Sequence, residues 1–451
     1  MSRDLHTEKV FEKSLRDGIV RINAQVIDLD KQGKTPISTR KLELFHWYFL
    51  AAYYGLIIPF KIQKREDDKV WETKSWMFQK LLCFIIFRPL IWLGILTRFA
   101  LVVRKFYANK DYRPKDYLEF ATNTLYFANL FNFSWTLIIR REKLEKLFNN
   151  VSAFSLFHLE KPSVPLSSRV SRRTKWFLTA YMVGLFVFCI AFYVIRRTFY
   201  NTSFQRTIQN GRKRFFLVDW QSNVSLLHIN RTNDTHDIYS NVNFLVAFAQ
   251  LALSISELWY RVFVVTFFSG ALPVTFWSAS KLFQRYLSGI DTLRAESLPL
   301  NESFDSSLAD MIVEKYEELK NLVASLNSVW STATLVYVIC KSVELVVYSN
   351  RKVMKKDVVH LFAFVCFTFF FVVMLILLAE GCRMNDSIKL WLYKTSTREQ
   401  VFVEQKSELE CLKMDFEVAP VGIGTFGVCV ISYGFLSQLL VFCVTVFLIT
   451  F

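Results

Sequence analysis

The chain has 451 residues, of which 53% are hydrophobic and 45 are Phe, and its mean hydropathy is +0.26. This composition is typical of an integral membrane protein rather than of a soluble globule. The net charge of +16 does not indicate nucleic-acid binding, because the Lys and Arg residues lie between apolar segments, as they do at the flanks of membrane spans.

The sequence offers no pattern of a metal or catalytic centre. Most of the eight cysteines lie within apolar segments, with no CxxC or other metal-type spacing, so we expect no disulfide framework, zinc site or other cofactor. The six His residues are scattered, which argues against a multi-pass enzyme. The charged N-terminus has no apolar core, so we do not expect a cleavable signal peptide.

The N-terminal region, residues 1–79, is expected to lie on the cytosolic side. Its first part is basic and carries apolar residues at helical spacing, as does a helix that lies on a partner or on the membrane surface. Residues 42–60 are aromatic but contain Glu43 and His46, and they end close to Pro59. We expect an interfacial or re-entrant segment there, with a true span as the alternative.

The apolar segments predict an all-α fold with seven membrane-spanning helices. In chain order these are Leu81–Val103, Tyr117–Ile139, Trp176–Ile195, Asn243–Phe268 (which can run on past Pro273), Val329–Tyr348, Val358–Ala379 and the terminal stretch Gly422–Phe451. Residues 80–275 therefore hold the first four helices, 328–380 the fifth and sixth, and 422–451 the seventh.

The loop 196–242 fixes the expected topology, because it contains four N-x-[ST] sequons, at Asn201, Asn223, Asn230 and Asn233. N-glycosylation takes place on the lumenal side, so this cluster predicts a glycosylated extracellular loop. Counting spans from it places the N-terminus in the cytosol and the C-terminus outside, in accordance with the positive-inside rule. Three further sequons, at Asn150, Asn301 and Asn385, fall on the cytosolic side. A G-protein-coupled receptor would have the opposite orientation.

Two cytosolic connections, residues 276–327 and 381–421, are predicted to be helical. In the first, apolar residues recur on one helical face from Leu308 to Leu326. Because no Pro or Gly intervenes before Val329, this helix should continue without a break into the fifth span. We expect both segments to extend below the membrane and to form an anchor bundle there.

Charged groups inside spans are costly and therefore indicate a partner or a task. Two pairs of opposite charge lie three and four residues apart, as neighbours on a helix do. Each is either a local ion pair along its helix or part of a polar cavity wall or gating contact. With two Trp residues that we consider for a sensory role, the candidate stimulus pocket consists of Lys341, Glu344, Glu257, Arg261, Trp76 and Trp330.

The terminal stretch 422–451 has no charged residue and is long enough to cross a hydrocarbon core of ~30 Å. At about 100° per residue, its small and polar residues Gly427, Gly434, Gln438 and Thr445 fall in one narrow sector. This stripe is either a packing seam against another helix or the face that lines a water-filled path together with copies of itself.

The order of these features resembles the insect gustatory receptor family, and within it the nematode relatives linked to light and hydrogen peroxide sensing. The resemblance rests on the segment YYGLIIPF, on the basic patch after the second span, and on a run before the fifth span. That run consists of Tyr316, Leu319, Leu322, Val323, Leu326, Asn327, Trp330 and Ser331. The family's terminal signature is Thr-Tyr, five apolar residues and Gln-Phe. Here the chain has Cys443-Val444, TVFLI and Thr450-Phe451, which adds Thr450 to the candidate pore residues.

The resemblance implies a ligand-gated, non-selective cation channel in the plasma membrane, surrounded by lipid and assembled as a homo- or heterotetramer. The four seventh helices would line one central pore, and a small-molecule stimulus would bind in the outer half of each subunit. The stimulus would be hydrogen peroxide or light. A small organic taste ligand is the alternative, and a seven-span G-protein-coupled receptor is a further one.

Overall fold

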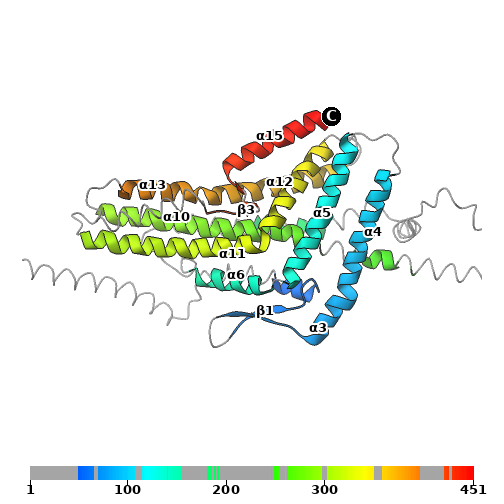
Figure 1. The fold of residues 1–451 in the computed structure, drawn as a ribbon, viewed down its shortest axis with the longest axis horizontal. Coiled ribbons are helices and arrows are strands. Elements are labelled where there is room, and N and C mark those ends of the chain that lie inside the picture. Colours follow the sequence, from blue (N-terminus) through cyan, green and yellow to red (C-terminus); the bar gives the residue numbers. More distant parts are fainter. Residues whose placement is uncertain are drawn as a thin grey trace, which may run out of the picture.

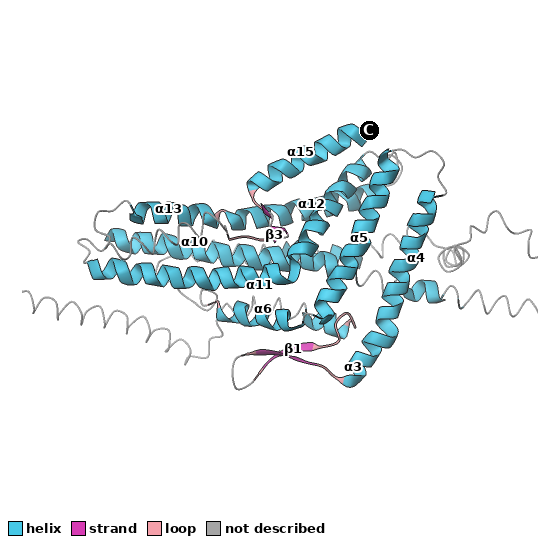
Figure 2. Cartoon of the chain, in the orientation of Figure 1, coloured by secondary structure: helices cyan, strands magenta, loops and turns pink. Residues whose placement is uncertain are grey.

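The computed structural model describes residues 49–65, 70–107, 114–139, 141–154, 263–296, 302–349, 358–396, 421–425 and 429–450, with residues 248–253 and a few scattered residues between 180 and 260. The helices are α3 (Met77–Leu81), η1 (Leu82–Phe87), α4 (Arg88–Tyr107), α5 (Pro114–Ile139), α6 (Arg141–Ala153), η3 (Phe267–Ala271), α10 (Leu272–Glu296), α11 (Glu302–Ser349), α12 (Val358–Cys382), α13 (Met384–Ser396) and α15 (Tyr433–Thr450). Two antiparallel hairpins pair β1 (Lys61–Lys64) with β2 (Trp71–Lys74) and β3 (Gly424–Thr425) with β4 (Cys429–Val430). Helices dominate the structure (Figures 1 and 2).

The mostly helical membrane fold expected from the sequence is confirmed. Within the described residues, four stretches are long and apolar enough to cross a membrane, and α15 is a shorter apolar helix. The four are Met77–Arg104, Phe263–Ser288, Ile312–Val346 and Thr368–Tyr393. Most of the expected third span, 176–195, lies outside the described residues, as does the loop 196–242 with all four of its sequons.

Helix α11 is continuous over 48 residues, as predicted from the absence of Pro and Gly before the fifth span. Its first part lies beside α10, which packs in turn against α13 in an elongated bundle, and its later part rises beside α5 (Figure 1). The apolar face predicted for it is buried, and Leu319, Leu322 and Leu326 are fully inaccessible. α11 therefore joins the membrane part of the fold to the bundle.

Each of the two π-helical turns ends two residues before a proline, and the proline accounts for the change from α-helix to π-helix. η1 ends at Phe87 before Pro89, and η3 ends at Ala271 before Pro273. A proline has no N–H to donate to the carbonyl four residues earlier, so the helix hydrogen-bond pattern changes just before it. The carbonyl that Pro273 leaves free is that of Ser269, and it accepts a hydrogen bond from the Tyr181 hydroxyl. The predicted fourth span does continue past Pro273.

The hairpin β1–β2 was not predicted from the sequence. Residues 49–54 are helical, and the chain then turns at Leu56, whose φ of 59° lies in the left-handed region. In the hairpin that follows, the ring of Trp71 packs on that of Phe148 in α6, with 5.3 Å between centroids. The main-chain N–H of Trp71 donates to Asn149 Oδ1 (2.8 Å), so the hairpin is fixed to α6. The interfacial interpretation of residues 42–60 stays a prediction.

The terminal stretch is not one helix, contrary to the prediction for Gly422–Phe451. Its first part forms the hairpin β3–β4, closed by a bond from Ile431 N to the carbonyl of Ile423 (3.1 Å). Glycines weaken the helix propensity of this part, and hydrogen bonds from Asn327, and from Asn385 to the preceding Val421, hold its main chain extended. α15 begins only at Tyr433 and has 18 residues, about 27 Å at ~1.5 Å per residue. That length is still close to the thickness of a hydrocarbon core.

Gly381 allows α12 to approach α10 closely. A Cβ atom at this position would lie 2.4 Å from Cε1 of Phe276, whose side chain is fully buried. We therefore expect Gly381→Ala to lower the free energy of unfolding by about 1–3 kcal/mol, the usual cost of overpacking a core. The measurement is the melting temperature of the purified chain in detergent. Gly184→Ala is the matched control, because a Cβ there meets no atom within 4 Å. Equal melting temperatures of the two variants would contradict the prediction.

Candidate functional site

Helix α15 has one face on its own subunit and one face without cover. Phe435, Leu436 and Leu439 pack against the core. On the other side, Val441 and Leu448 are 65% and 72% exposed. In Figure 1 the helix lies at the upper edge of the fold, and its inner side contacts α11, α12 and α5. An exposed face of large apolar side chains needs lipid or another protein surface to cover it.

The predicted polar stripe lies on the uncovered side of α15. Gly434, Gln438 and Thr445 are all exposed. The hydroxyl of Thr445 donates to the carbonyl of Val441 (2.9 Å), one turn earlier. Gly427 lies outside the described residues. Thr450 is the last residue of the helix, and its side chain is likewise outside the described part.

The hairpin that precedes α15 is held by Asn327 of α11. Asn327 Nδ2 donates to the carbonyl of Gly422 (2.9 Å), and the main-chain N–H of Gly424 donates to Asn327 Oδ1 (3.0 Å). One amide thus pairs with both a donor and an acceptor of the chain just before the helix. Both glycines are buried, so without this side chain their polar groups would lose their partners.

The junction between α12 and α13 holds the same hairpin from the other side. Asn385 Nδ2 donates to the carbonyl of Val421 (2.9 Å), and the Cys382 thiol donates to that of Ile431 (3.1 Å). The contact is tight, because a Cβ at Gly422 would lie 2.9 Å from Sγ of Cys382. We call this set, Asn327, Cys382 and Asn385 with the hairpin, the clamp.

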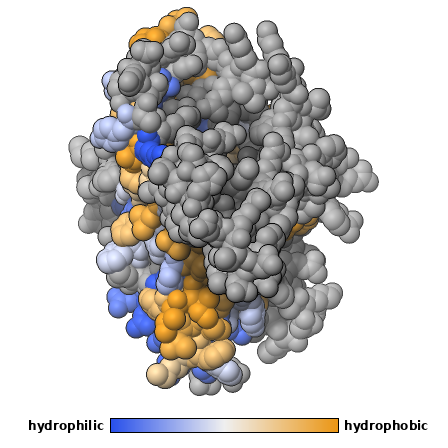
Figure 3. Space-filling model, turned by 90° about the vertical axis from the view of Figure 1, so that its right-hand side faces the viewer, coloured by the Kyte–Doolittle hydropathy of each residue, from blue (hydrophilic) through white to orange (hydrophobic). Residues whose placement is uncertain are grey.

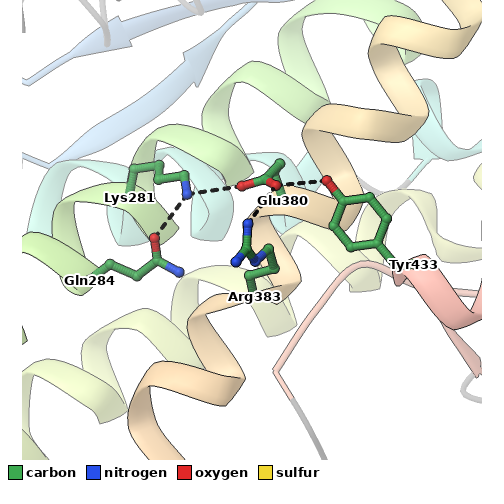
Figure 4. Close-up of polar contacts among 5 residues, drawn as sticks. All are labelled: Lys281, Gln284, Glu380, Arg383 and Tyr433. Carbon is green, nitrogen blue, oxygen red and sulfur yellow. Dashed lines mark hydrogen bonds and ion pairs between the residues drawn. The ribbon is translucent and has the colours of Figure 1, made fainter. Parts of the chain in front are cut away.

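A carboxylate joins the first residue of α15 to the neighbouring helices (Figure 4). Glu380 Oε1 accepts from the Tyr433 hydroxyl (2.7 Å) and from Arg383 Nη1 (3.2 Å), while Oε2 accepts from Lys281 Nζ (3.1 Å). Lys281, on α10, also donates to Gln284 Oε1 (3.0 Å). The start of α15 is therefore tied to α10 and α12 as well as to α11.

The structure describes four of the six predicted pocket residues, and these four lie in three separate places. Lys341 Nζ lies 2.5 Å from Glu344 Oε2 on the same helix, so these two form an intrahelical ion pair. Trp330 is fully buried, whereas Trp76 is 69% exposed at the start of α3. Glu257 and Arg261 lie outside the described residues.

Trp330 instead belongs to a buried aromatic and polar cluster around η3. Its ring lies 4.2 Å, between centroids, from that of Phe267. Beside it, the hydroxyls of Ser269 and Tyr337 share a hydrogen bond (2.8 Å). The hydroxyl of Tyr181 contacts the carbonyl of Ser269 and lies 3.2 Å from that of Phe370 in α12. The hydroxyls of this cluster are thus paired with one another and with main-chain carbonyls inside an apolar interior.

Sequence reasoning missed Glu380 and the clamp residues. Asn327 belongs to the run of residues before the fifth span, where no role is assigned to it. Its position among apolar core residues was the signal that could have indicated one. An amide on a buried helical face needs hydrogen-bond partners from a neighbouring segment. Glu380 directly follows the sixth apolar segment, and an acid at that position is another such signal. No sequence signal of this kind marks Tyr433.

Two of the extra sequons are engaged in packing. Asn150 Nδ2 donates to the carbonyl of Asn321 (3.2 Å) and contacts Ser325 Oγ (2.5 Å), both on α11. Asn385 is 8% exposed and belongs to the clamp. A glycan on either side chain would require these contacts to break.

Substitutions of Lys341 and Glu344 can distinguish a structural ion pair from a polar wall of a ligand cavity. Because an unpaired charge in a span is costly, we expect Lys341→Met or Glu344→Gln alone to lower surface expression severalfold. The charge-swapped double variant, Lys341→Glu with Glu344→Lys, should restore it, which surface labelling of intact cells measures. Normal expression of the single variants with an altered stimulus sensitivity would instead place the pair in a ligand cavity.

Solved structures with a similar fold identify the architecture. The structure of the insect olfactory receptor OR5 from Machilis hrabei matches with a TM-score of 0.56 at 13% identity, over 91% of this chain and 98% of that chain. The same receptor in complex with eugenol matches with a TM-score of 0.51 at 12% identity, over the same shares. No protein-family profile and no curated protein matches the chain. At such low identity the likeness establishes the fold alone: a multi-pass helical membrane protein with the fold of an insect olfactory receptor.

Proposed function

We propose that the chain is a chemosensory receptor that acts as a ligand-gated, non-selective cation channel in the plasma membrane. Four copies, identical or related, would surround one pore, with α15 of each copy facing the centre. The N-terminus would lie in the cytosol, and the loop 196–242 would carry glycans outside. Within this class we assign the chain to the gustatory receptors, and to their nematode branch that responds to hydrogen peroxide or light.

The observation that carries the proposal is the uncovered face of α15. This helix is apolar and about as long as a hydrocarbon core is thick, and it exposes Gly434, Gln438 and Thr445 on the side that its own subunit leaves open. Small residues permit close approach of helices, and amide and hydroxyl groups can replace part of the water around an ion. The overall fold supports the proposal, since it extends over nearly the whole of an insect olfactory receptor.

The aromatic cluster around η3 bears on the class of stimulus. A structural neighbour was solved with eugenol, a small phenol. Tyr181, Tyr337 and Trp330 would offer aromatic faces and hydroxyls to a molecule of this kind. This favours a small organic ligand as the second candidate beside hydrogen peroxide and light.

Expression of the chain alone in cells without other such receptors tests the proposal. Under voltage clamp, hydrogen peroxide, short-wavelength light and a panel of small phenols are applied in turn. A stimulus-evoked current with a reversal potential near zero in mixed cations supports the channel. Surface expression without any current, together with an N-terminal tag that is accessible on intact cells, would reject it in favour of a G-protein-coupled receptor.

A further inference from the structure

The hairpin β1–β2 has two chemically different faces. In a strand, alternate residues point to opposite sides, and the register pairs Lys61 with Lys74 and Gln63 with Glu72. These four residues therefore share one face. The other face holds Ile62 and Trp71, both buried, and Thr73, whose hydroxyl donates to Glu145 of α6. Lys64, at the end of β1, lies on this face too, but it is exposed. The hairpin thus turns its apolar side toward α6 and its basic side outward.

The two lysines oppose each other without a compensating acid. Like charges directly across a pair of strands repel, which is a cost that an anion between them removes. The single acid of the outer face, Glu72, accepts a hydrogen bond from Gln63 Nε2 (3.3 Å). Neither Lys61 nor Lys74 forms an ion pair with any carboxylate in the part of the chain that the structure describes. The hairpin is held to α6, so its outer face keeps this orientation.

The membrane surface must lie close to these lysines. The first span begins at Met77, three residues after Lys74, so the chain between them covers at most ~10 Å. Trp76 and Met77 are 69% and 85% exposed, and Trp is the residue typical of the membrane interface. Figure 3 faces the side of the molecule on which α3 and α4 lie, and its lower part shows a hydrophobic patch with hydrophilic residues on both sides.

The geometry points to a binding surface for anionic phospholipid headgroups, formed by Lys61 and Lys74 and bordered by Trp76 and the exposed Lys80 of α3. The two ammonium groups would flank a headgroup phosphate or carboxylate of the leaflet in which the first span begins. Under the proposed topology this is the cytosolic leaflet, which carries the anionic lipids. The site is independent of the pore and of the stimulus.

Lipid carried by the purified full-length chain tests this surface. The chain is reconstituted in vesicles of four parts phosphatidylcholine and one part phosphatidylserine, extracted mildly, and its bound lipid is quantified by mass spectrometry. We expect phosphatidylserine to be enriched over its share in the vesicles. The variant Lys61→Gln/Lys74→Gln should lower this enrichment about fivefold per lysine, the factor that corresponds to ~1 kcal/mol per basic residue at a membrane surface.

Three further arms make the result decisive. Lys61→Arg/Lys74→Arg keeps the charge and should keep the enrichment. Lys320→Gln/Lys389→Gln removes the same charge from the bundle, at the exposed Lys389 of α13 and at the half-buried Lys320 of α11, which pairs with Glu317, and should leave the enrichment unchanged. Soluble glycerophosphoserine should not displace the lipid, because the membrane supplies the headgroup at high local concentration. The proposal is overturned if the Gln variant keeps the enrichment, if either paired variant behaves otherwise, or if the soluble headgroup competes.

Discussion

Asn327→Ala is expected to abolish most of the stimulus-evoked current while the chain still reaches the cell surface. The substitution removes the partners of the Gly422 carbonyl and the Gly424 N–H, both in a buried segment. Each buried polar group left without a partner costs about 1–3 kcal/mol. Since ~1.4 kcal/mol is a factor of ten in an equilibrium, a conformation with α15 correctly placed would lose at least about tenfold in population. Current density, normalised to surface protein, is the measurement.

Asn150→Ala is a matched control for this prediction. Its amide also contacts α11, at Asn321 and Ser325, but it lies on α6, and these bonds reach neither the hairpin nor α15. It should lower the melting temperature and leave the normalised current within about twofold, because it removes packing but not the clamp. Asn327→Asp keeps the acceptor for Gly424 and loses the donor to Gly422, so an intermediate current is expected. A normal current in Asn327→Ala, or an equal loss in Asn150→Ala, would show that the clamp does not position α15.

Gln438→Glu is expected to change ion selectivity. In an assembly of four copies, this substitution would place four carboxylates in one ring of the pore, and acidic rings favour cations of higher charge. The permeability of Ca²⁺ relative to Na⁺ should therefore rise severalfold, measured from the shift in reversal potential when external Na⁺ is replaced by Ca²⁺. Leu440→Glu places the same charge on an exposed residue outside the stripe, where it should impair folding or gating and leave the reversal potential unchanged. An equal shift in both variants would contradict the assignment.

The helices could be predicted from the sequence because their signals are local. The long apolar segments and the unbroken pattern before Val329 depend only on residues within one helix, and α5, α11 and α12 appear where these patterns place them. The start of α15 could not be located in this way. The segment from Gly422 to Ile431 is as apolar as the helix that follows. Its described residues, 422–425 and 429–431, form a hairpin rather than a helix because Asn327 binds the main chain of Gly422 and Gly424, and Asn385 binds that of the preceding Val421. Such contacts join residues far apart in the sequence.

The candidate site, too, could be predicted where it depends on local periodicity and could not where it depends on tertiary contacts. The stripe on α15 depends on helical periodicity, and its residues within the helix, Gly434, Gln438 and Thr445, do share the uncovered side. The proposed pocket required knowledge of which helices are neighbours, and among its described members only Lys341 and Glu344 lie together. Trp330 is buried against η3, whereas Trp76 lies on the surface at the start of α3. The two lysines of the β1–β2 hairpin face each other only because of a strand register that no apolar pattern indicated.

The most direct test of the central claim, that α15 lines an ion pathway, is cysteine accessibility during current recording. The native Cys443 of α15 is first replaced by Ala, so that the introduced cysteine carries the single thiol of this helix. A water-soluble, charged thiol reagent should then block the current of Thr445→Cys and leave Leu436→Cys, on the packed face, unaffected. Silence of Thr445→Cys together with block of Thr450→Cys would contradict the account, because the stripe would then be a packing seam and the pore would lie on another face of the helix.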